Sequence, residues 1–176
     1  MDCKVISEVV NEDEAALADE VRKLGRLVRT GHRWQMATAE SCTGGAIAAA
    51  LTAAPGASEW FAGSLVTYDT QWKCRYLGVS PETVASFGVA SCQVVRQMLE
   101  GLQERFGVKA GCAVSGIAGP TGAEEGKPVG TVYIGAMAGG VFHVRRFNFD
   151  GDREAVRGAT VRCAIRMLIE LLENRE

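Results

Sequence analysis

The chain has 176 residues, 47% of them hydrophobic and 23% charged, a composition typical of a globular domain with one full core. Its net charge is −2 without any Lys/Arg block, which argues against nucleic-acid and membrane-surface partners. No apolar run approaches the roughly 20 residues that cross a bilayer, and residues 1–14 do not resemble a signal peptide. We therefore expect a single domain over residues 1–176, located in the cytoplasm.

The first predicted helix begins near a capping box at residues 11–14 and ends at Gly31. Residues 1–10 have no clear pattern. A short β-like run over residues 34–39 then leads into the octapeptide Thr-Ala-Glu-Ser-Cys-Thr-Gly-Gly at residues 38–45. A second helix, rich in alanine, is predicted over residues 43–54.

The octapeptide is the first candidate site. A Ser on a tight strand-to-helix turn exposes its hydroxyl beside free backbone N–H groups, and the helix dipole favours negative charge there. Gly44 and Gly45 lack a Cβ, so a ligand or another backbone can approach closely. Ser41 is thus a candidate nucleophile, although the octapeptide alone favours a simpler interpretation in which Ser41 or Thr43 only caps the helix.

A strand is predicted next over residues 60–68, preceded by Ser58 and with Tyr68 at its carboxyl end. Residues 71–77 form one or two helical turns in which Lys73 and Leu77 share a face. That face directs the Lys73 ammonium towards the protein, although a surface lysine that extends into water is the commoner case.

Two helices and a strand follow. Ser80-Pro81 and Ser91 each have the pattern of a helix start, and Gly107 ends the second of these helices. Residues 110–114 are predicted to form a short buried strand.

A glycine-rich loop follows that strand, with Gly at positions 116, 119, 122 and 126. Such loops often bind phosphate through backbone N–H groups. This one lacks the Gly-Lys-Ser/Thr ending of a P-loop and the helix of a dinucleotide fingerprint. A flexible surface loop explains the pattern equally well.

The last predicted elements are a hairpin and a long helix. Strands over residues 129–138 and 141–149 flank Gly139-Gly140, and residues 150–152 open the final helix. Arg153 and Arg157 lie in its first turns, where cations oppose the helix dipole. They indicate either a bound anion or pairing with the neighbouring acids Asp150, Asp152 and Glu154.

About five strands alternate with helices and end in a hairpin, which predicts a three-layer α/β/α domain with a mixed, mostly parallel sheet. Functional sites of such sheets gather at the carboxyl ends of strands. We therefore expect Ser41, the segment with Tyr68 and Lys73, and the loop over residues 115–122 to converge on one cleft.

A serine nucleophile needs a base, and neither His32 nor His143 is well placed to serve. Lys73 and Lys127 remain, because burial can lower the pKa of a lysine enough for it to act as a base. Cys42 stays open as an alternative nucleophile. The six scattered cysteines have no metal-ligand spacing and are expected to be reduced thiols, so no metal site is expected.

Five segments resemble the signature blocks of the CinA C-terminal domain family, and they occur in the family's order. The resemblance covers about residues 12–173. The blocks are Thr38 to Gly45; Tyr68 with Lys73 and Leu77-Gly78-Val79; Ser115 to Pro120; Lys127 to Val132; and Gly151-Asp152-Arg153.

The resemblance implies hydrolysis of nicotinamide mononucleotide (NMN) to nicotinic acid mononucleotide and ammonia, within pyridine nucleotide recycling. It implies a Ser41 nucleophile, a Lys73 base and a nearby Tyr68. Substrate-binding roles pass by position to Cys42, Thr43, Gly44, Gly45, Ser58, Ser115, Gly116, Gly119 and Arg153.

Two departures from the family pattern bear on these roles. Ser115 is often Thr in the family, and Ala123 replaces a common Gly. No metal or other cofactor is implied, and self-association, with a homodimer as the default, is expected. The alternative function is a non-catalytic nucleotide-binding domain of the same fold, against which the intact Ser41, Tyr68 and Lys73 argue.

Overall fold

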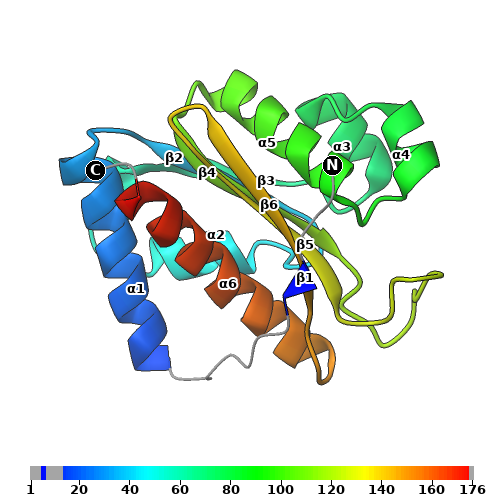
Figure 1. The fold of residues 1–176 in the computed structure, drawn as a ribbon. Coiled ribbons are helices and arrows are strands. Elements are labelled where there is room, and N and C mark those ends of the chain that lie inside the picture. The colour runs from blue at the N-terminus through cyan, green and yellow to red at the C-terminus, as the bar shows by residue number, and fades with distance from the viewer. Residues whose placement is uncertain (1–4, 7–13, 175–176) are drawn as a thin grey trace.

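A computed structural model describes residues 5–6 and 14–174 (Figure 1). Its centre is a six-stranded sheet in the order β1-β6-β5-β4-β2-β3. The strands are β1 (Val5–Ile6), β2 (Met36–Glu40), β3 (Phe61–Val66), β4 (Ala110–Gly116), β5 (Thr131–Ala138) and β6 (Val141–Asn148).

The sheet is mixed and mostly parallel, as predicted. Strand β2 is parallel to both β3 and β4, and β1 is parallel to β6. Strand β5 runs antiparallel to β4 and β6, and β5 and β6 form the predicted hairpin. The additional strand is β1, whose two residues are too few to show an alternating pattern in the sequence.

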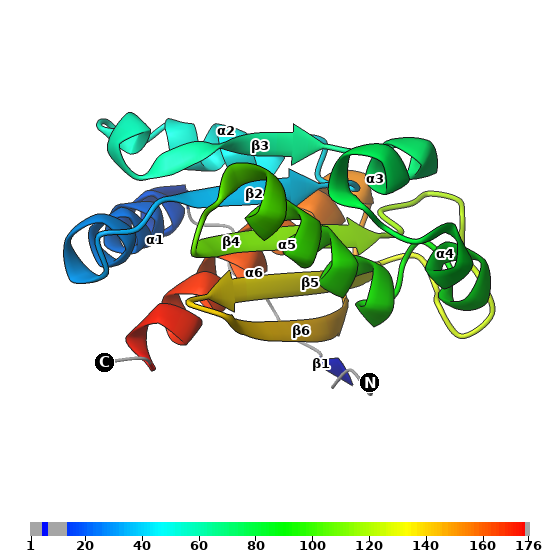
Figure 2. The same cartoon turned by 90° about the horizontal axis from the view of Figure 1, so that it is seen from above.

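Helices cover both faces of the sheet, which confirms the three-layer prediction (Figures 1 and 2). One face carries α1 (Glu14–Arg26), α2 (Ala46–Thr52) and α6 (Arg153–Glu173), and the other carries α3 (Thr70–Leu77), α4 (Pro81–Phe87) and α5 (Cys92–Phe106). Among the described residues, no helix combines the length and the hydrophobicity that a membrane crossing requires.

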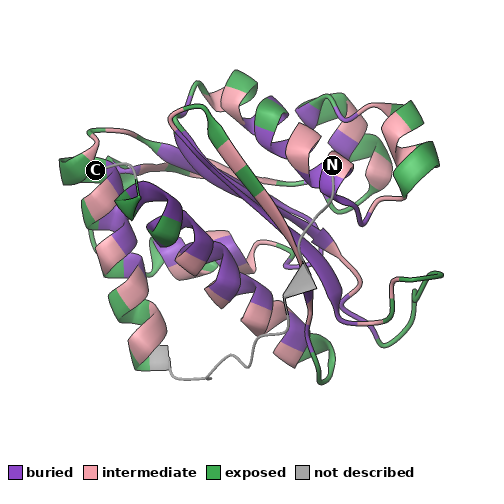
Figure 3. Ribbon diagram, in the orientation of Figure 1, coloured by how far each residue is buried: buried purple, intermediate pink, exposed green. Residues whose placement is uncertain are grey.

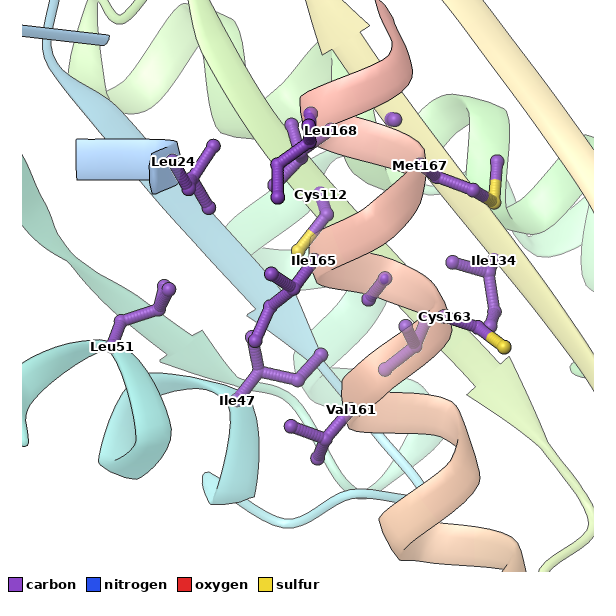
Figure 4. Packing of buried hydrophobic residues seen from close by; sticks show 14 of the residues in the cluster. Leu24, Ile47, Leu51, Cys112, Ile134, Val161, Cys163, Ile165, Met167 and Leu168 are labelled. Carbon is purple, nitrogen blue, oxygen red and sulfur yellow. The ribbon is translucent and has the colours of Figure 1, made fainter. Parts of the chain in front are cut away.

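The larger core lies between the sheet and α6, where side chains such as Ile165 and Val161 pack near Ile47 of α2 (Figure 4). The central strands are buried on both faces, because helices cover them on each side (Figure 3). Strand β6 is less buried, as expected for a strand towards the edge of the sheet. The centre of the sheet is therefore the most deeply buried part of the fold.

Several helix ends lie where the sequence predicts them. Ser80, Ser91 and Asp152 cap α4, α5 and α6 through their side chains. Helix α1 continues as a π-helical turn, η1 (Leu27–Gly31), and ends at the predicted Gly31. The predicted capping box at its start includes residues 11–13, which lie outside the described residues.

Cys42, Cys74, Cys112 and Cys163 are reduced thiols, as expected. Cys92 is disulfide-bonded, so the expectation that every cysteine is reduced is wrong at this position.

Candidate active site

The candidate site lies at the carboxyl edge of the parallel strands β2, β3 and β4, whose arrowheads point the same way in Figure 2. Ser41 directly follows β2, and Tyr68 follows β3 after one intervening residue. Ser115 lies within the last two residues of β4. The structure therefore brings these three segments to one edge, as the sequence predicts.

Strand register places three hydroxyl side chains side by side on one face. Glu40 pairs with Val66, so extending this register by one residue sets Ser41 opposite Thr67. Ala39 pairs with Ala113, and continuing this register by two residues sets Ser41 opposite Ser115. Alternation along a strand puts Ser41, Thr67 and Ser115 on the face of Ala39, Leu65 and Ala113, which pack with α3 and α5.

Lys73 reaches this row of hydroxyls from α3. The residue is fully buried, and its Nζ donates to the carbonyl oxygens of Thr67 at 2.6 Å and Tyr68 at 3.0 Å. Burial lowers the pKa of Lys73 to about 8, although the nearby Cys42, Asp69 and Cys74 oppose this shift. A neutral amine has two N–H donors, so the two carbonyls occupy both and leave its lone pair available to a serine proton.

Ser41 is buried, with 7% of its surface exposed, so the expectation of an exposed hydroxyl on this turn is wrong. Within the part of the chain that the structure describes, no hydrogen bond joins Ser41 Oγ to Lys73 Nζ. Catalytic hydrogen bonds are often looser in ligand-free enzymes than in the Michaelis complex. The structure places Ser41 and Lys73 at the same edge of the sheet and on the same face, without a direct hydrogen bond between them.

Cys42 has the opposite electrostatic character. Burial raises the pKa of its thiol to about 12, although the N–H groups of Cys42 and Thr43 and the Lys73 ammonium oppose the shift. The thiolate is the nucleophilic form of cysteine. Cys42 is therefore a neutral thiol near pH 7, which favours Ser41 over Cys42 as the nucleophile.

Glu40 organises the turn that carries Ser41, and the sequence analysis missed it. Its fully buried carboxylate accepts from Thr43 Oγ1 at 2.7 Å and from Ser64 Oγ at 3.3 Å. It also accepts from three backbone N–H groups at the start of α2, those of Gly45 (2.9 Å), Ile47 (3.1 Å) and Ala48 (2.8 Å). A carboxylate at the end of a buried strand was the signal that could have found it.

This arrangement shows that most of the N–H groups expected to be free beside Ser41 already have acceptors. The first N–H groups of α2 already bind Glu40, and the Gly44 N–H donates to the Ser41 carbonyl at 3.0 Å. Of the N–H groups near Cys42 to Gly44, those of Cys42 and Thr43 are left as the candidate oxyanion donors. The Thr43 hydroxyl likewise donates to Glu40.

Gly44 and Gly45 adopt the left-handed backbone conformation that this turn requires. Their φ angles are 61° and 96°, a region that residues with a Cβ rarely adopt. A Cβ on either glycine would meet its nearest neighbour at an ordinary 3.7 Å. The turn conformation therefore requires both glycines, and no other backbone segment approaches them closely among the described residues.

Arg153 joins three segments of the site. Its Nη1 donates to the Gly119 carbonyl at 2.8 Å and its Nη2 donates to the Tyr68 hydroxyl at 2.9 Å. Arg157, one turn further along α6, donates from Nη2 to the Thr43 carbonyl at 2.7 Å. Both arginines thus contact the site, and neither is paired with the acids beside it.

The remaining loop residues have mainly structural contacts. The Ser115 hydroxyl donates to the Val89 carbonyl at 2.9 Å, which leaves its oxygen able to accept from a ligand. A Cβ on Gly116 would lie 2.6 Å from the Thr131 carbonyl, so this glycine is required by packing between β4 and β5. Gly119 has a φ of 83° and presents its carbonyl to Arg153.

Two candidates lie elsewhere. Ser58 belongs to η2 (Ala57–Glu59), which precedes β3, so it lies at the opposite end of that strand from Tyr68 and the structure does not bring it to the site. Lys127, the second candidate base, donates to the Phe87 carbonyl at 2.8 Å and to Glu124 at 3.2 Å. The residues that the structure describes contain no cluster of three or more metal-ligating side chains.

The chain is similar in sequence to several known proteins. The chain is 47% identical over 137 residues to the nicotinamide-nucleotide amidohydrolase PncC of Pseudomonas putida, covering 78% of this chain and 86% of that protein. It is 40% identical to a CinA-like protein of Syntrophomonas wolfei over 84% of this chain, but it spans only 35% of that relative's length.

Solved structures share the fold. The crystal structure of the competence damage-inducible protein A (ComA) from Klebsiella pneumoniae matches with a TM-score of 0.87 and 34% sequence identity, over 91% of this chain and 99% of that one. The family described as "CinA C-terminal domain" matches residues 17–172. This chain therefore belongs to the CinA C-terminal domain family.

Proposed function

We propose that the protein is an amidohydrolase that converts NMN and water into nicotinic acid mononucleotide and ammonia. The observation that carries the proposal is the buried Lys73 amine, held by two carbonyls at the same edge and face as Ser41. The relative from P. putida, which bears the name of this activity, supports the choice of substrate.

Lys73 is the base in the proposed mechanism. Ser41 Oγ attacks the carboxamide carbon while its proton passes to Lys73 Nζ. The N–H groups of Cys42 and Thr43 stabilise the oxyanion that forms. The Lys73 ammonium then protonates the leaving nitrogen, ammonia departs, and water hydrolyses the acyl-enzyme through the same lysine. Its pKa of about 8 suits it to accept and return a proton near neutral pH.

Arg153 is proposed to bind the phosphate of NMN. Its guanidinium lies between the loops that follow β3 and β4, at the start of a helix whose dipole favours anions. Phosphate would replace the Gly119 and Tyr68 contacts as the acceptor of its N–H groups. Tyr68 and the Ser115 oxygen remain candidate substrate contacts, and Ser58 is left out of the proposed site because of its position.

Ammonia release from NMN by the purified protein tests the proposal, with Ser41→Ala as the matched inactive control. Release by the wild type alone supports it. NMN binding in a calorimeter without ammonia release would instead favour the non-catalytic nucleotide-binding alternative. The homodimer and the cytoplasmic location expected from the sequence remain part of the proposal, and light scattering on the purified protein checks the dimer.

A further inference from the structure

Thr67 holds a buried hydroxyl that has no partner. The residue is 2% exposed, and its Oγ1 makes no hydrogen bond with any residue that the structure describes. Its backbone, in contrast, is fully engaged. The N–H donates to the Glu40 carbonyl at 2.9 Å, and the carbonyl accepts from Lys73 Nζ at 2.6 Å.

Such a hydroxyl is not explained by stability. Buried polar side chains nearly always have a hydrogen-bond partner, because an unpaired one loses its hydration without compensation. A valine has almost the same shape and carries no such penalty. The retained hydroxyl therefore indicates a partner that is absent from the resting arrangement of the site.

Its position identifies the partner. Glu40 and Val66 are the last registered pair of β2 and β3, so Ser41 and Thr67 are the next residues along each chain. If the alternation of the strands continues by one residue, both side chains share the face of Ala39 and Leu65, which α3 and α5 cover. Neighbouring strands are about 4.8 Å apart, so two hydroxyls on one face come within hydrogen-bond distance after a change of side-chain rotamer. The carbonyl of the same residue holds the Lys73 amine.

We propose that Thr67 is a positioning residue whose hydroxyl donates a hydrogen bond to Ser41 Oγ in the reactive arrangement. Because Thr67 then donates to one lone pair of Ser41 Oγ, the Ser41 O–H bond is oriented towards Lys73 Nζ. During attack the bond from Ser41 Oγ to the carboxamide carbon forms, the Ser41 proton moves to Lys73, and Thr67 keeps its proton. The inference rests on the proposed function for the identity of the substrate and for the roles of Ser41 and Lys73.

The test compares Thr67→Val and Thr67→Ser with the wild type. Thr67→Val should lower kcat for NMN about 10- to 100-fold, the effect of losing a hydrogen bond to a developing charge. KM should change little, and the Tm should stay equal or rise because the unpaired hydroxyl is gone. Thr67→Ser should restore most of kcat. Thr160→Val is the matched control, since the buried Thr160 hydroxyl donates to Val156 within α6 and should not affect kcat.

A second readout is independent of NMN: the rate at which a serine-directed fluorophosphonate labels Ser41, with Ser41→Ala as the unlabelled control. Slower labelling of Thr67→Val than of Thr160→Val supports the inference, even if the wild type releases no ammonia from NMN. Absence of ammonia release would contradict only the proposed hydrolysis of NMN. Wild-type kcat and labelling rate in Thr67→Val would overturn the inference. A lowered Tm of Thr67→Val together with an equal loss of kcat in Thr67→Ser would also overturn it. So would a wild type in which the fluorophosphonate does not label Ser41.

Discussion

Arg153 and Tyr68 are 85 positions apart in the sequence and are joined by a 2.9 Å hydrogen bond between Nη2 and the phenolic oxygen. The same guanidinium donates to Gly119, so one side chain connects the start of α6 with the loops that follow β3 and β4. All three segments meet at the carboxyl edge of the sheet. Both acceptors are neutral, which leaves the positive charge of Arg153 available to an anion.

Arg153→Lys should raise KM for NMN, and Arg153→Ala should raise it further, by about 10- to 100-fold. The physical reason is that a guanidinium can hold phosphate through two parallel hydrogen bonds, which an ammonium cannot reproduce. Steady-state kinetics with nicotinamide riboside, which lacks the phosphate, provide the control. Riboside hydrolysis should be slow in the wild type and little affected by Arg153→Ala. An equal loss with both substrates would make Arg153 a structural link between the loops.

Ser41→Ala should abolish most ammonia release with the fold intact, whereas Cys42→Ala should remain active. The difference follows from the pKa of Cys42, which burial raises to about 12, so that almost no thiolate exists at neutral pH. Mass spectrometry of the quenched enzyme should place any acyl adduct on Ser41. An inactive Cys42→Ala variant with an active Ser41→Ala variant would move the nucleophile to the cysteine.

Lys73 should set the pH dependence of the reaction. The base must be neutral, and burial lowers the pKa of Lys73 to about 8, so kcat/KM should rise about tenfold per pH unit below that value and level off above it. A lysine with its ordinary pKa would give a rise that continues towards pH 10.

Lys73→Met keeps the length of the side chain and removes the base, and it should reduce kcat by roughly 10²–10⁴-fold. Lys127→Met is the matched control, because Lys127 is bonded to Phe87 and Glu124 away from the site. Near-normal kcat in Lys73→Met, or a pH profile without a limb near 8, would remove Lys73 from the mechanism.

Glu40→Ala should destabilise the protein strongly and reduce activity with it. The substitution leaves the Gly45, Ile47 and Ala48 N–H groups without their acceptor, at roughly 1–3 kcal/mol for each buried unpaired group. Chemical denaturation measures the loss.

Glu59→Ala is the control for that measurement, since Glu59 makes an exposed ion pair with Arg29. Such pairs contribute about 0–1 kcal/mol. Equal stability losses in the two variants would show that Glu40 does not anchor the start of α2.

The sequence predicts the layers, the hairpin and the edge at which the site forms, because these depend on periodicity and on helix caps. Strand pairing, in contrast, depends on contacts between segments that are far apart in the sequence. Glu40 and Thr67 acquire their roles from residues on neighbouring segments. The place of Glu40 at the end of a buried strand marks it as a residue of interest, but no local pattern shows which N–H groups it binds or that the Thr67 hydroxyl lacks a partner. The same limit explains Ser58, whose motif position does not reveal that it precedes a parallel strand while the site follows it.

The antiparallel pairing of β4 and β5 allows the glycine-rich loop between them to vary in length. Because β5 runs antiparallel to β4, residues 117–130 leave and re-enter the sheet at the same edge. Backbone hydrogen bonds of 2.8 Å close this loop at its base, from the Ile117 N–H to the Thr131 carbonyl and from the Gly130 N–H to the Ile117 carbonyl. Insertions or deletions around the exposed residues 121–126 are therefore isolated from the strand register, and evolution can vary the rim of the site at little cost in stability.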